Sequence, residues 1–256
     1  MAAKSSLSAA LLFLLLAGSG RAAWTISSSE NEPGSTAGVE HRHLVVANNA
    51  NGDEARLDLA LFSTKAATVR VIDNPGGHEL AEVMRRLRGV AGVNGGYFDP
   101  QNAPVGLVIV DGRSMAPFRK AKLLSGVLVV NKNRVELLRS TEYTPRKAAT
   151  AALQCGPFLV DGGKAVPGLN NTRPARRTFF FSNGSDRAGM GFCSSVTLAE
   201  LGEILVTPRL TGELKLQRAL NFDGGSSSAF WFAGERGEFS IGEYKTVRNF
   251  VVVTAK

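Results

Sequence analysis

Four segments of the chain place small and polar residues at the end of, or next to, apolar runs typical of β-strands. They are VNGGYFDP (93–100), CGPFLVDGG (155–163), RRTFFF (176–181) and LNFDGGSSS (220–228). Glycines at a strand end let the backbone approach a ligand closely, and their amides can hold an anion. A carboxylate there can act as general acid, general base or nucleophile, and an arginine can hold a phosphate. The combination is typical of an anion-binding site beside a reactive carboxylate.

Each segment also has a structural interpretation when it is taken alone. DGG and NGG form hairpin turns in many proteins. Arg176 and Arg177, just before an aromatic strand, can be charged residues that keep an exposed sheet edge from pairing with another strand. The three serines can begin the next element. The functional signal is therefore the presence of all four segments in one chain.

Five motifs, in this order along the chain, resemble those of the phosphodiester glycosidase family, and the stretch after the first resembles its bacterial members of unknown function. The motifs are NGGYF, GPFLVDGG, RRT, TLAEL and LNFDGGSSS, and the similar region spans residues 85–253. The chain departs from the family pattern at Phe222, where leucine is usual, and at Ser226, where glycine or proline is usual. Near the end, KTVRNF has Lys245 where the family has arginine.

The resemblance implies a sugar–phosphate substrate and a pocket built from the matching positions. These are Asn94, Gly95, Gly96, Gly156, Arg177, Asp223, Gly224, Gly225 and Ser227. Cleavage at the anomeric carbon passes through an oxocarbenium-like state and requires a carboxylate near the sugar and donors around the phosphate. We therefore assign Asp223 as nucleophile or base, Arg177 as phosphate clamp and Asn94 as the group that orients sugar or water. The glycine amides are expected to contact phosphate oxygens.

Three further aspartates lie in Asp-Pro or Asp-Gly turns, which are usually structural. Asp99, Asp111 and Asp161 are each candidates for a second carboxylate, and Asp99 is favoured as a substrate-binding residue because it lies beside the Asn94 loop. No cofactor is predicted. Carboxylates and turn carbonyls can collect a divalent cation such as Ca²⁺, although the sequence contains no EF-hand-like loop.

Histidines and cysteines are few. HRH places His41 and His43 on one face of a strand, and we interpret them as exposed residues rather than a metal pair because no third ligand is evident nearby. Cys155 and Cys193 are the only cysteines. Export makes one disulfide between them possible, but the sequence does not establish that they pair.

Two other functions remain open at this point. A serine of GSSS can be the nucleophile of an esterase or phosphatase, but the chain lacks a G-x-S-x-G elbow and His78 is the only plausible base. The other is a non-enzymatic envelope protein that binds glycans or a partner chain through residues 179–181 and 230–232. We favour core packing for these aromatic residues because they lie in strand-like runs.

The N-terminus has the three parts of a secretory signal peptide. Lys4 is followed by the apolar run 7–17 and by small residues, with Gly20 and Ala22 before the expected cleavage site. The sequence thus predicts an exported protein, periplasmic or secreted, with residues 1–22 removed. No other apolar run is long enough to span a bilayer, so no stable membrane insertion is expected after cleavage.

The composition is that of an ordinary globular protein. The chain has 256 residues, of which 44% are hydrophobic and 20% charged. Loss of residues 1–22 removes two basic residues and no acidic one, so the formal net charge of +8 falls to +6. A mildly basic protein favours anionic substrates. The basic residues are scattered, and nucleic acid is not expected as a partner.

Hydrophobic periodicity predicts more strands than helices, joined mostly by short turns, which indicates a single α+β domain with a mixed, largely antiparallel sheet. Residues 23–84 are assigned to N-terminal strands of this domain and residues 85–256 to its catalytic region. Residues 24–38 are interpreted as a mobile leader or an irregular first strand. Helices are predicted at 78–89 and from Thr197, where Thr197 and Glu200 form a capping box.

Overall fold

The computed structural model describes residues 24–132, 134–145 and 148–256, so the predicted signal peptide lies outside the described residues. Every pairing between named strands is antiparallel, and the described residues form two α-helices and three sheets. The prediction of an α+β fold with largely antiparallel sheet is therefore confirmed.

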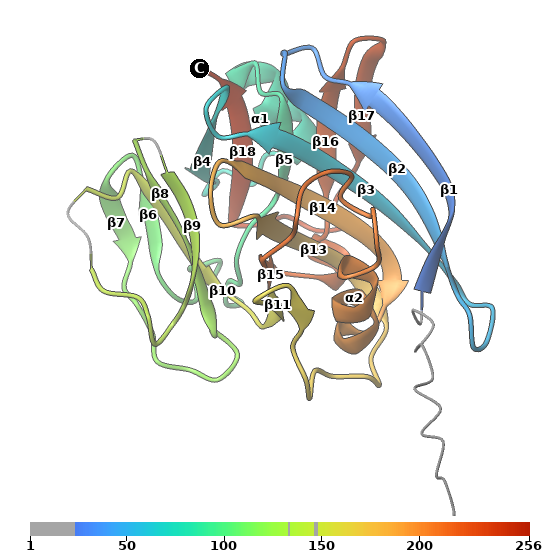
Figure 1. Ribbon diagram of the computed structural model, residues 1–256. Coiled ribbons are helices and arrows are strands. Elements are labelled where there is room, and N and C mark those ends of the chain that lie inside the picture. The colour runs from blue at the N-terminus through green and yellow to red at the C-terminus, as the bar shows by residue number, and fades with distance from the viewer. Residues whose placement is uncertain (1–23, 133, 146–147) are drawn as a thin grey trace, which may run out of the picture.

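The largest sheet has eight strands in the order β1-β2-β3-β14-β13-β15-β11-β12 (Figure 1). Its strands are β1 (Trp24–Pro33), β2 (Val39–Asn48), β3 (Glu54–Ser63), β14 (Arg187–Val196), β13 (Ala175–Ser182), β15 (Arg218–Asn221), β11 (Phe158–Asp161) and β12 (Lys164–Ala165). Of the two interpretations of residues 24–38, the strand is correct, because β1 pairs with β2 along its length and Trp24 is buried. N-terminal strands thus share a sheet with β13 to β15.

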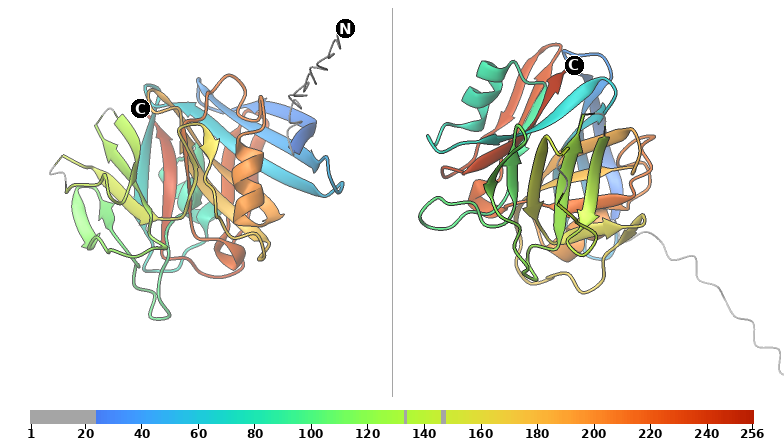
Figure 2. Two further views of the ribbon diagram at one scale, coloured as in Figure 1. Left: turned by 60° about the horizontal axis from the view of Figure 1, so that its bottom comes forward. Right: turned by 90° about the vertical axis from the view of Figure 1, so that its left-hand side faces the viewer.

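Two five-stranded sheets complete the fold. One has the order β7-β6-β10-β8-β9, and the other has the order β17-β16-β5-β18-β4. Strands of the first are β6 (Val108–Val110), β7 (Arg113–Ala116), β8 (Gly126–Asn131), β9 (Arg134–Arg139) and β10 (Ala151–Cys155). Those of the second are β4 (Ala67–Asp73), β5 (Ala91–Asn94), β16 (Phe230–Gly234), β17 (Gly237–Ile241) and β18 (Asn249–Ala255). The first stands at one side of the molecule, at the left of Figure 1 and facing the viewer in the right-hand view of Figure 2.

The aromatic strand β13 is buried on both faces, which confirms core packing for its phenylalanines. Phe179 and Phe181 belong to a cluster that includes Leu201 of helix α2 (Leu198–Leu205), whereas Phe180 belongs to a second cluster with Phe222. This alternation follows from the period of two in a strand. Residues 230–232 are also buried, at no more than 4% exposure. The stacking surfaces on which a binding-module interpretation depends are therefore absent from these two strands.

Both predicted helices form close to their expected bounds. Helix α1 (Leu80–Leu87) packs Leu80, Val83 and Met84 against the sheet that contains β16 and β18. Helix α2 begins with the predicted capping box: the Thr197 hydroxyl accepts a bond from the Glu200 amide, and the Glu200 carboxylate accepts one from the Thr197 amide. Such a cap stabilises a helix by about 0.5 to 2 kcal/mol.

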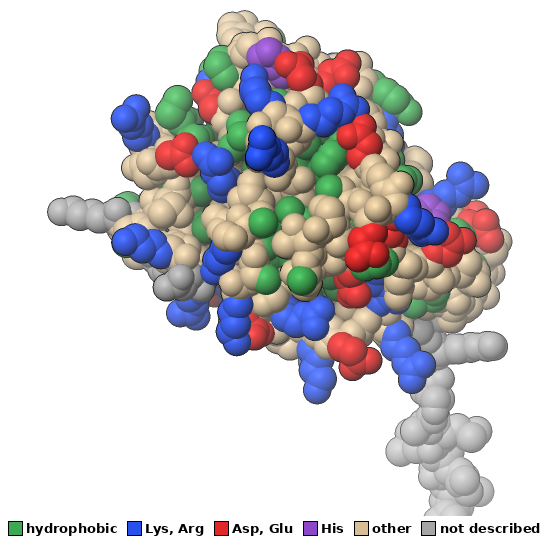
Figure 3. Space-filling model, turned by 90° about the horizontal axis from the view of Figure 1, so that it is seen from above, with side chains coloured by type: hydrophobic (Ala, Val, Ile, Leu, Met, Phe, Trp, Pro, Cys, Tyr) green, Lys and Arg blue, Asp and Glu red, His purple; other side chains and the backbone are tan. Residues whose placement is uncertain are grey.

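Lys and Arg side chains on the face seen from above are interspersed with Asp and Glu (Figure 3). This distribution agrees with the scattered basic residues of the sequence. Within the described part of the chain, neither helix is long and apolar enough to cross a bilayer.

Candidate active site

Strand ends from all three sheets meet at one place in the molecule. They are the C-terminal ends of β5, β10 and β15 and the N-terminal ends of β13 and β18. Backbone bonds connect them: Asp223 N donates to Gly95 O at 3.0 Å, and Gly95 N donates to Asn249 O at 2.9 Å. The Tyr97 hydroxyl reaches Gly156 O at 2.6 Å. Segments separated by more than a hundred residues thus form one cluster.

Asn94 holds the loop that carries the candidate catalytic aspartate. Its Nδ2 donates to Asp223 O at 2.8 Å, and its Oδ1 accepts a bond from Ala229 N at 3.0 Å. The side chain is 0% exposed. These contacts favour Asn94 as a support for the 223–229 loop, and its orientation of sugar or water stays a prediction, with no contact that favours it.

We expect Asn94→Ala to lower the free energy of unfolding by about 2 to 4 kcal/mol, because each buried backbone group left without a partner costs about 1 to 3 kcal/mol. Urea denaturation followed by circular dichroism measures the change. Asn51→Ala, in the exposed turn between β2 and β3, is the matched control and should shift the midpoint little. An Asn94→Ala protein as stable as the wild type would contradict the supporting role.

Asp223 lies in a half-buried position two residues after the end of β15. Burial raises the pKa of its carboxyl group, and three neighbours partly offset this effect by lowering it: the Ser227 hydroxyl, the Lys245 ammonium and the Gly224 amide. The amide donates to Asp223 Oδ1 at 2.9 Å. Ser227 Oγ is buried and has no hydrogen-bond partner of normal geometry among the described residues, although it is close enough to affect Asp223. A carboxylate with a raised pKa is suited to exchange protons during catalysis.

Arg177 is fixed by carbonyl groups on one side and lies beside Gly224 on the other. Its Nε donates to Val196 O at 3.0 Å and its Nη2 to Arg173 O at 2.6 Å. A Cβ atom added to Gly224 would lie 3.7 Å from Arg177 Nη1, for which the described residues offer no hydrogen-bond partner. Burial lowers the pKa of this guanidinium, but its normal value is so high that the charge remains.

Asp223 and Arg177 do not form an ion pair among the described residues. Instead, both groups act on Tyr97: the Asp223 charge raises the pKa of its hydroxyl, and the Arg177 charge lowers it. The cation that acts on Asp223 is Lys245. The carboxylate therefore lies in a cluster with two cations, neither of which neutralises it by direct contact.

Tyr97 and Asn221 are site residues that our sequence interpretation missed. Burial is the main reason why the pKa of Tyr97 is raised. Its hydroxyl and Asn221 Nδ2 both bond to Gly156 O, at 2.6 and 3.0 Å. Both residues lie inside the NGGYF and LNFDGG motifs, so the signal was present, but we assigned function only to the glycines and the charged residues.

The glycines of the site serve mainly to let segments approach one another. A Cβ atom on Gly95 would lie 2.1 Å from Asn249 Oδ1, and one on Gly156 would lie 2.2 Å from Leu123 O. The amides of Gly95 and Gly96 already donate to Asn249, at 2.9 and 2.8 Å. They are thus unavailable to the phosphate oxygens that we expected them to contact.

Two backbone amides near Asp223 do remain available. Gly225 and Ser226 begin the 3₁₀ turn η1 (Gly225–Ser227), and their N–H groups have no acceptor among the described residues. Gly225 has a φ of +66°, a conformation that favours glycine. Successive free amides in such a turn form an anion-binding concavity. The same geometry explains why a Gly-Ser segment directly follows Asp223.

The other three aspartates make contacts that belong to their own turns or to ion pairs. Asp99 Oδ1 accepts bonds from the amides of residues 101 and 103, so the carboxylate closes its own loop. Asp111 pairs with Arg70 at the turn between β6 and β7. Asp161 pairs with Arg139 and with Arg218. Substrate binding by Asp99 stays a prediction, with no contact that favours it.

The interpretation of His41 as exposed was wrong, whereas the side chain of His43 is 38% exposed. His41 is 4% exposed and lies among the rings of Phe230, Phe232 and Phe239. His41 Nε2 and His43 Nδ1 both contact Oδ1 of buried Asp58 at 2.9 Å. Within the described residues no group of three or more His, Cys, Asp or Glu side chains is arranged to hold a metal ion, these three included.

Both cysteines are free and buried. Burial raises the pKa of Cys155 to about 12, with a further increase from the Asp223 charge. The thiol is therefore neutral near neutral pH, and it is a poor nucleophile.

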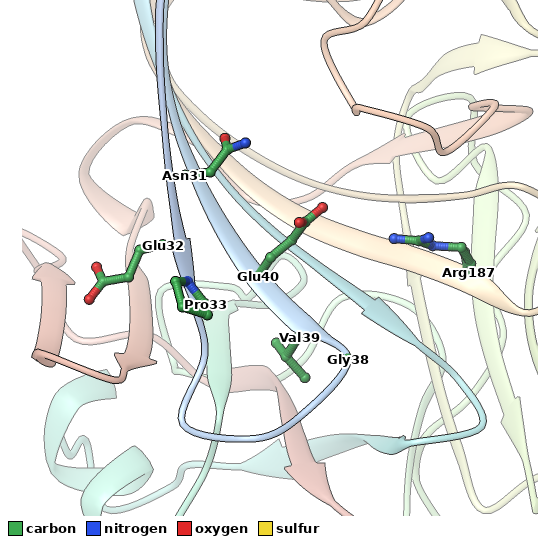
Figure 4. Close-up of a pocket in the computed structure, with 7 residues that line it drawn as sticks. All are labelled: Asn31, Glu32, Pro33, Gly38, Val39, Glu40 and Arg187. Carbon is green, nitrogen blue, oxygen red and sulfur yellow. The ribbon is translucent and has the colours of Figure 1, made fainter.

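A pocket of about 330 Å³ lies beside the turn between β1 and β2, away from this cluster (Figure 4). Glu40 extends toward Arg187, whereas Glu32 points to the opposite side of the strands. Two carboxylates that face apart cannot flank one glycosidic bond, as most glycosidases require. The pocket also contains none of the predicted site residues.

Comparisons with known proteins agree with this fold. The catalytic domain of zebrafish N-acetylglucosamine-1-phosphodiester alpha-N-acetylglucosaminidase, auto-inhibited by its pro-peptide, is 13% identical over 90% of this chain and 89% of its own, with a TM-score of 0.63. A hypothetical protein from Synechocystis is 13% identical over 91% of this chain and 68% of its own, with a TM-score of 0.58. A search of the curated proteins finds no match.

One protein-family model, described as phosphodiester glycosidase, matches residues 87–254, close to the region in which the motifs resemble that family. The matched region contains Asp223, Arg177 and the strand ends that position them, and it covers well over half of the sequence. The chain therefore belongs to the phosphodiester glycosidase family.

Proposed function

We propose that this protein is an exported hydrolase that cleaves the glycosyl–phosphate bond of a sugar-1-phosphodiester in an envelope or exopolysaccharide component. The observation that carries the proposal is the half-buried Asp223 carboxylate beside the free amides of Gly225 and Ser226 and near the cations Lys245 and Arg177. Export rests on the signal-peptide pattern of residues 1–22. The family and the zebrafish relative, whose name specifies a sugar-1-phosphodiester, support the substrate class.

In the proposed complex, the phosphate lies at the turn that follows Asp223. Its oxygens accept bonds from the Gly225 and Ser226 amides, and Arg177 Nη1 faces it across Gly224. These donors are fixed by the fold before substrate binds, so little reorganisation is required as charge develops on the leaving phosphate. The anomeric carbon then lies near the Asp223 carboxylate.

The reaction consists of one substitution at the anomeric carbon. If Asp223 is the base, it takes a proton from water while the water oxygen bonds to the anomeric carbon. The bond between that carbon and the phosphate oxygen breaks, and the phosphomonoester leaves with the electron pair. If Asp223 is the nucleophile, a glycosyl ester forms first and water then hydrolyses it. Phosphate is a good leaving group, so no strong general acid is needed.

A non-enzymatic glycan- or partner-binding protein is less well supported. The aromatic residues that motivated it, 179–181 and 230–232, are in the core. A serine hydrolase is also poorly supported, because His78 contacts Glu82 on helix α1 and shares no contact with the 226–228 serines.

The test is a panel of methyl diesters of sugar 1-phosphates that includes glucose, mannose, galactose and N-acetylglucosamine. Release of free sugar and methyl phosphate, followed by ³¹P and ¹H NMR, is the expected result for at least one diester. The anomeric configuration of the first product distinguishes a base from a nucleophile, because a direct attack by water inverts it and a covalent intermediate retains it. No release from any diester at high enzyme concentration would contradict the proposal.

The pH dependence of the proposed reaction follows from the environment of Asp223. The carboxyl group must be ionised to act, and burial raises its pKa above the ordinary value of about 3.9. We therefore expect kcat/KM to fall as the pH decreases, with a midpoint above that value. Lys245→Met removes a charge that lowers this pKa, so the acidic limb should move to higher pH.

Normalised kcat/KM profiles measure this effect. Lys65→Met, at an exposed ion pair with Asp186, is the control and should leave the midpoint unchanged. A midpoint that moves to lower pH in Lys245→Met, or does not move, would contradict the assignment of Asp223 as the group that titrates.

A further inference from the structure

Tyr244 is the most exposed of the large apolar side chains in the described part of the chain. It is 78% exposed, compared with 55% for Leu123 and 47% for Met115. Single exposed apolar residues are common on protein surfaces. What distinguishes Tyr244 is that its backbone and one face of its ring are fixed.

Arg176 supports the ring from beneath. Its guanidinium carbon lies 4.1 Å from the centre of the Tyr244 ring and 5.1 Å from that of Phe192. Arg176 Nη2 donates to Ser228 O at 2.5 Å and to Gly242 O at 2.8 Å, which fixes the guanidinium. The cation–π contact thus holds an aromatic ring in place, with most of its surface still exposed to solvent.

The backbone of Tyr244 is bonded to the candidate active site. Its amide donates to Ser226 O at 2.8 Å, and Ser226 lies in the turn whose amides we assign to the phosphate. The next residue, Lys245, acts on the Asp223 carboxylate. Lys245 Nζ also lies 5.0 Å from the centre of the Phe98 ring. The 244–245 segment therefore borders the site at Asp223.

We propose that Tyr244 is a stacking platform for a pyranose ring of the substrate. This inference rests on the proposed function, which it deepens by assigning a sugar subsite. A pyranose presents an apolar face of C–H groups, and a tyrosine ring offers a flat apolar surface with a polar tip. Because Arg176 already fixes the ring, little side-chain entropy is lost on binding. The side chain of Arg177 approaches the turn at Gly224, and the backbone amide of Tyr244 donates to the turn at Ser226. The phosphate contact of Arg177 and the sugar contact of Tyr244 are therefore separate.

The test compares Tyr244→Ala with Tyr244→Phe, each in the Asp223→Asn background so that the ligand is not consumed. Binding of the methyl glycosyl phosphates is measured by NMR titration, with dimethyl phosphate as a probe that lacks a sugar. Loss of one stacking contact of about 1 to 1.5 kcal/mol predicts about a 5- to 12-fold weaker Kd in the alanine variant. The phenylalanine variant should bind within about 2-fold of its parent, because it retains the ring.

The dimethyl phosphate arm separates sugar from phosphate binding. Tyr244→Ala should leave the affinity for that probe unchanged, and in the active enzyme it should raise KM more than it lowers kcat. Thermal melting of each variant reports any general loss of structure. The proposed platform is overturned if the alanine variant binds the glycosyl phosphates as tightly as its parent does, or if the phenylalanine variant loses as much affinity as the alanine variant. It is also overturned if Tyr244→Ala lowers the affinity for dimethyl phosphate equally.

These outcomes are distinct from failure of the proposed function. If the wild-type enzyme hydrolyses no diester, the proposed activity fails, and the binding series still shows whether the ring contacts a sugar. If hydrolysis occurs and binding is unaffected by Tyr244→Ala, only the platform fails, and an exposed tyrosine of this kind would then fit a protein–protein contact.

Discussion

Asp223→Asn is expected to reduce kcat by about 10²- to 10⁴-fold, the range for loss of a general base, and by more if the carboxylate is the nucleophile. The asparagine side chain has nearly the same shape, and its Oδ1 can still accept the bond from the Gly224 amide. It cannot take a proton from water or bond to the anomeric carbon. Steady-state kinetics on the best diester of the panel measure the loss.

The same substitution is expected to leave the protein at least as stable as the wild type near neutral pH. Burial raises the pKa of Asp223 in the folded protein, so the ionised carboxylate is less favourable there than in the unfolded chain. This cost is absent at a pH below the pKa that Asp223 has in the unfolded chain, because the carboxyl group is then protonated in both states. It is fully present at a pH above the pKa that Asp223 has in the folded protein. The melting temperature of Asp223→Asn should therefore equal or exceed that of the wild type at neutral pH, with a difference that disappears in acid.

Asp111→Asn is the matched control, because Asp111 is 68% exposed at a hairpin turn with φ +47°, a conformation that asparagine tolerates. It should retain wild-type activity. Undiminished hydrolysis by Asp223→Asn would remove the central assignment. A large drop in its melting temperature would show instead that the carboxylate has a structural role.

The strands and helices could be predicted because their signals are local. The alternation in residues 55–63 and the Thr197–Glu200 box depend only on neighbouring residues, and both elements form as expected. The order of the strands within a sheet could not be predicted in this way, because β3 pairs with β14, which lies more than a hundred residues away in the sequence. Nothing in either strand specifies this partner, and only the recognised family motifs connected the distant segments before the structure was known.

Within the site, residue types could be predicted better than the direction of their contacts. The presence of Asp223 and Arg177 in one cluster follows from the motifs, but the orientation of Arg177 toward Val196 O does not, since that carbonyl belongs to β14. Likewise, a glycine is equally compatible with an anion contact and with close packing. The structure shows that Gly95 is packed against Asn249, while the Gly225 amide is available.

Buried polar residues were the least predictable. The HRH pattern of β2 is equally compatible with an exposed strand face and with a buried one. His41 is buried because the β16–β17 hairpin places Phe230 and Phe239 over it and because Asp58 on the neighbouring strand supplies a partner. Both conditions depend on tertiary contacts, so they could not be predicted from the spacing of the histidines alone.

Arg177→Met is expected to reduce kcat/KM by about 10²- to 10³-fold, similar to the loss of one donor that stabilises charge in a transition state. Methionine preserves much of the apolar stem but cannot donate to a phosphate oxygen. Arg177→Lys should recover little of the loss. A single ammonium cannot bond to both Val196 O and Arg173 O and also face Gly224, whereas the three nitrogens of the guanidinium do so together.

The control is Arg236→Met, at an exposed ion pair with Glu32, which should retain wild-type kcat/KM. Binding of dimethyl phosphate to Arg177→Met should weaken in parallel with kcat/KM, because we assign the same guanidinium to both. A variant that binds this probe normally and hydrolyses the diester at the wild-type rate would show that Arg177 only connects β13 to β14, and the phosphate contacts would then be left to the turn amides.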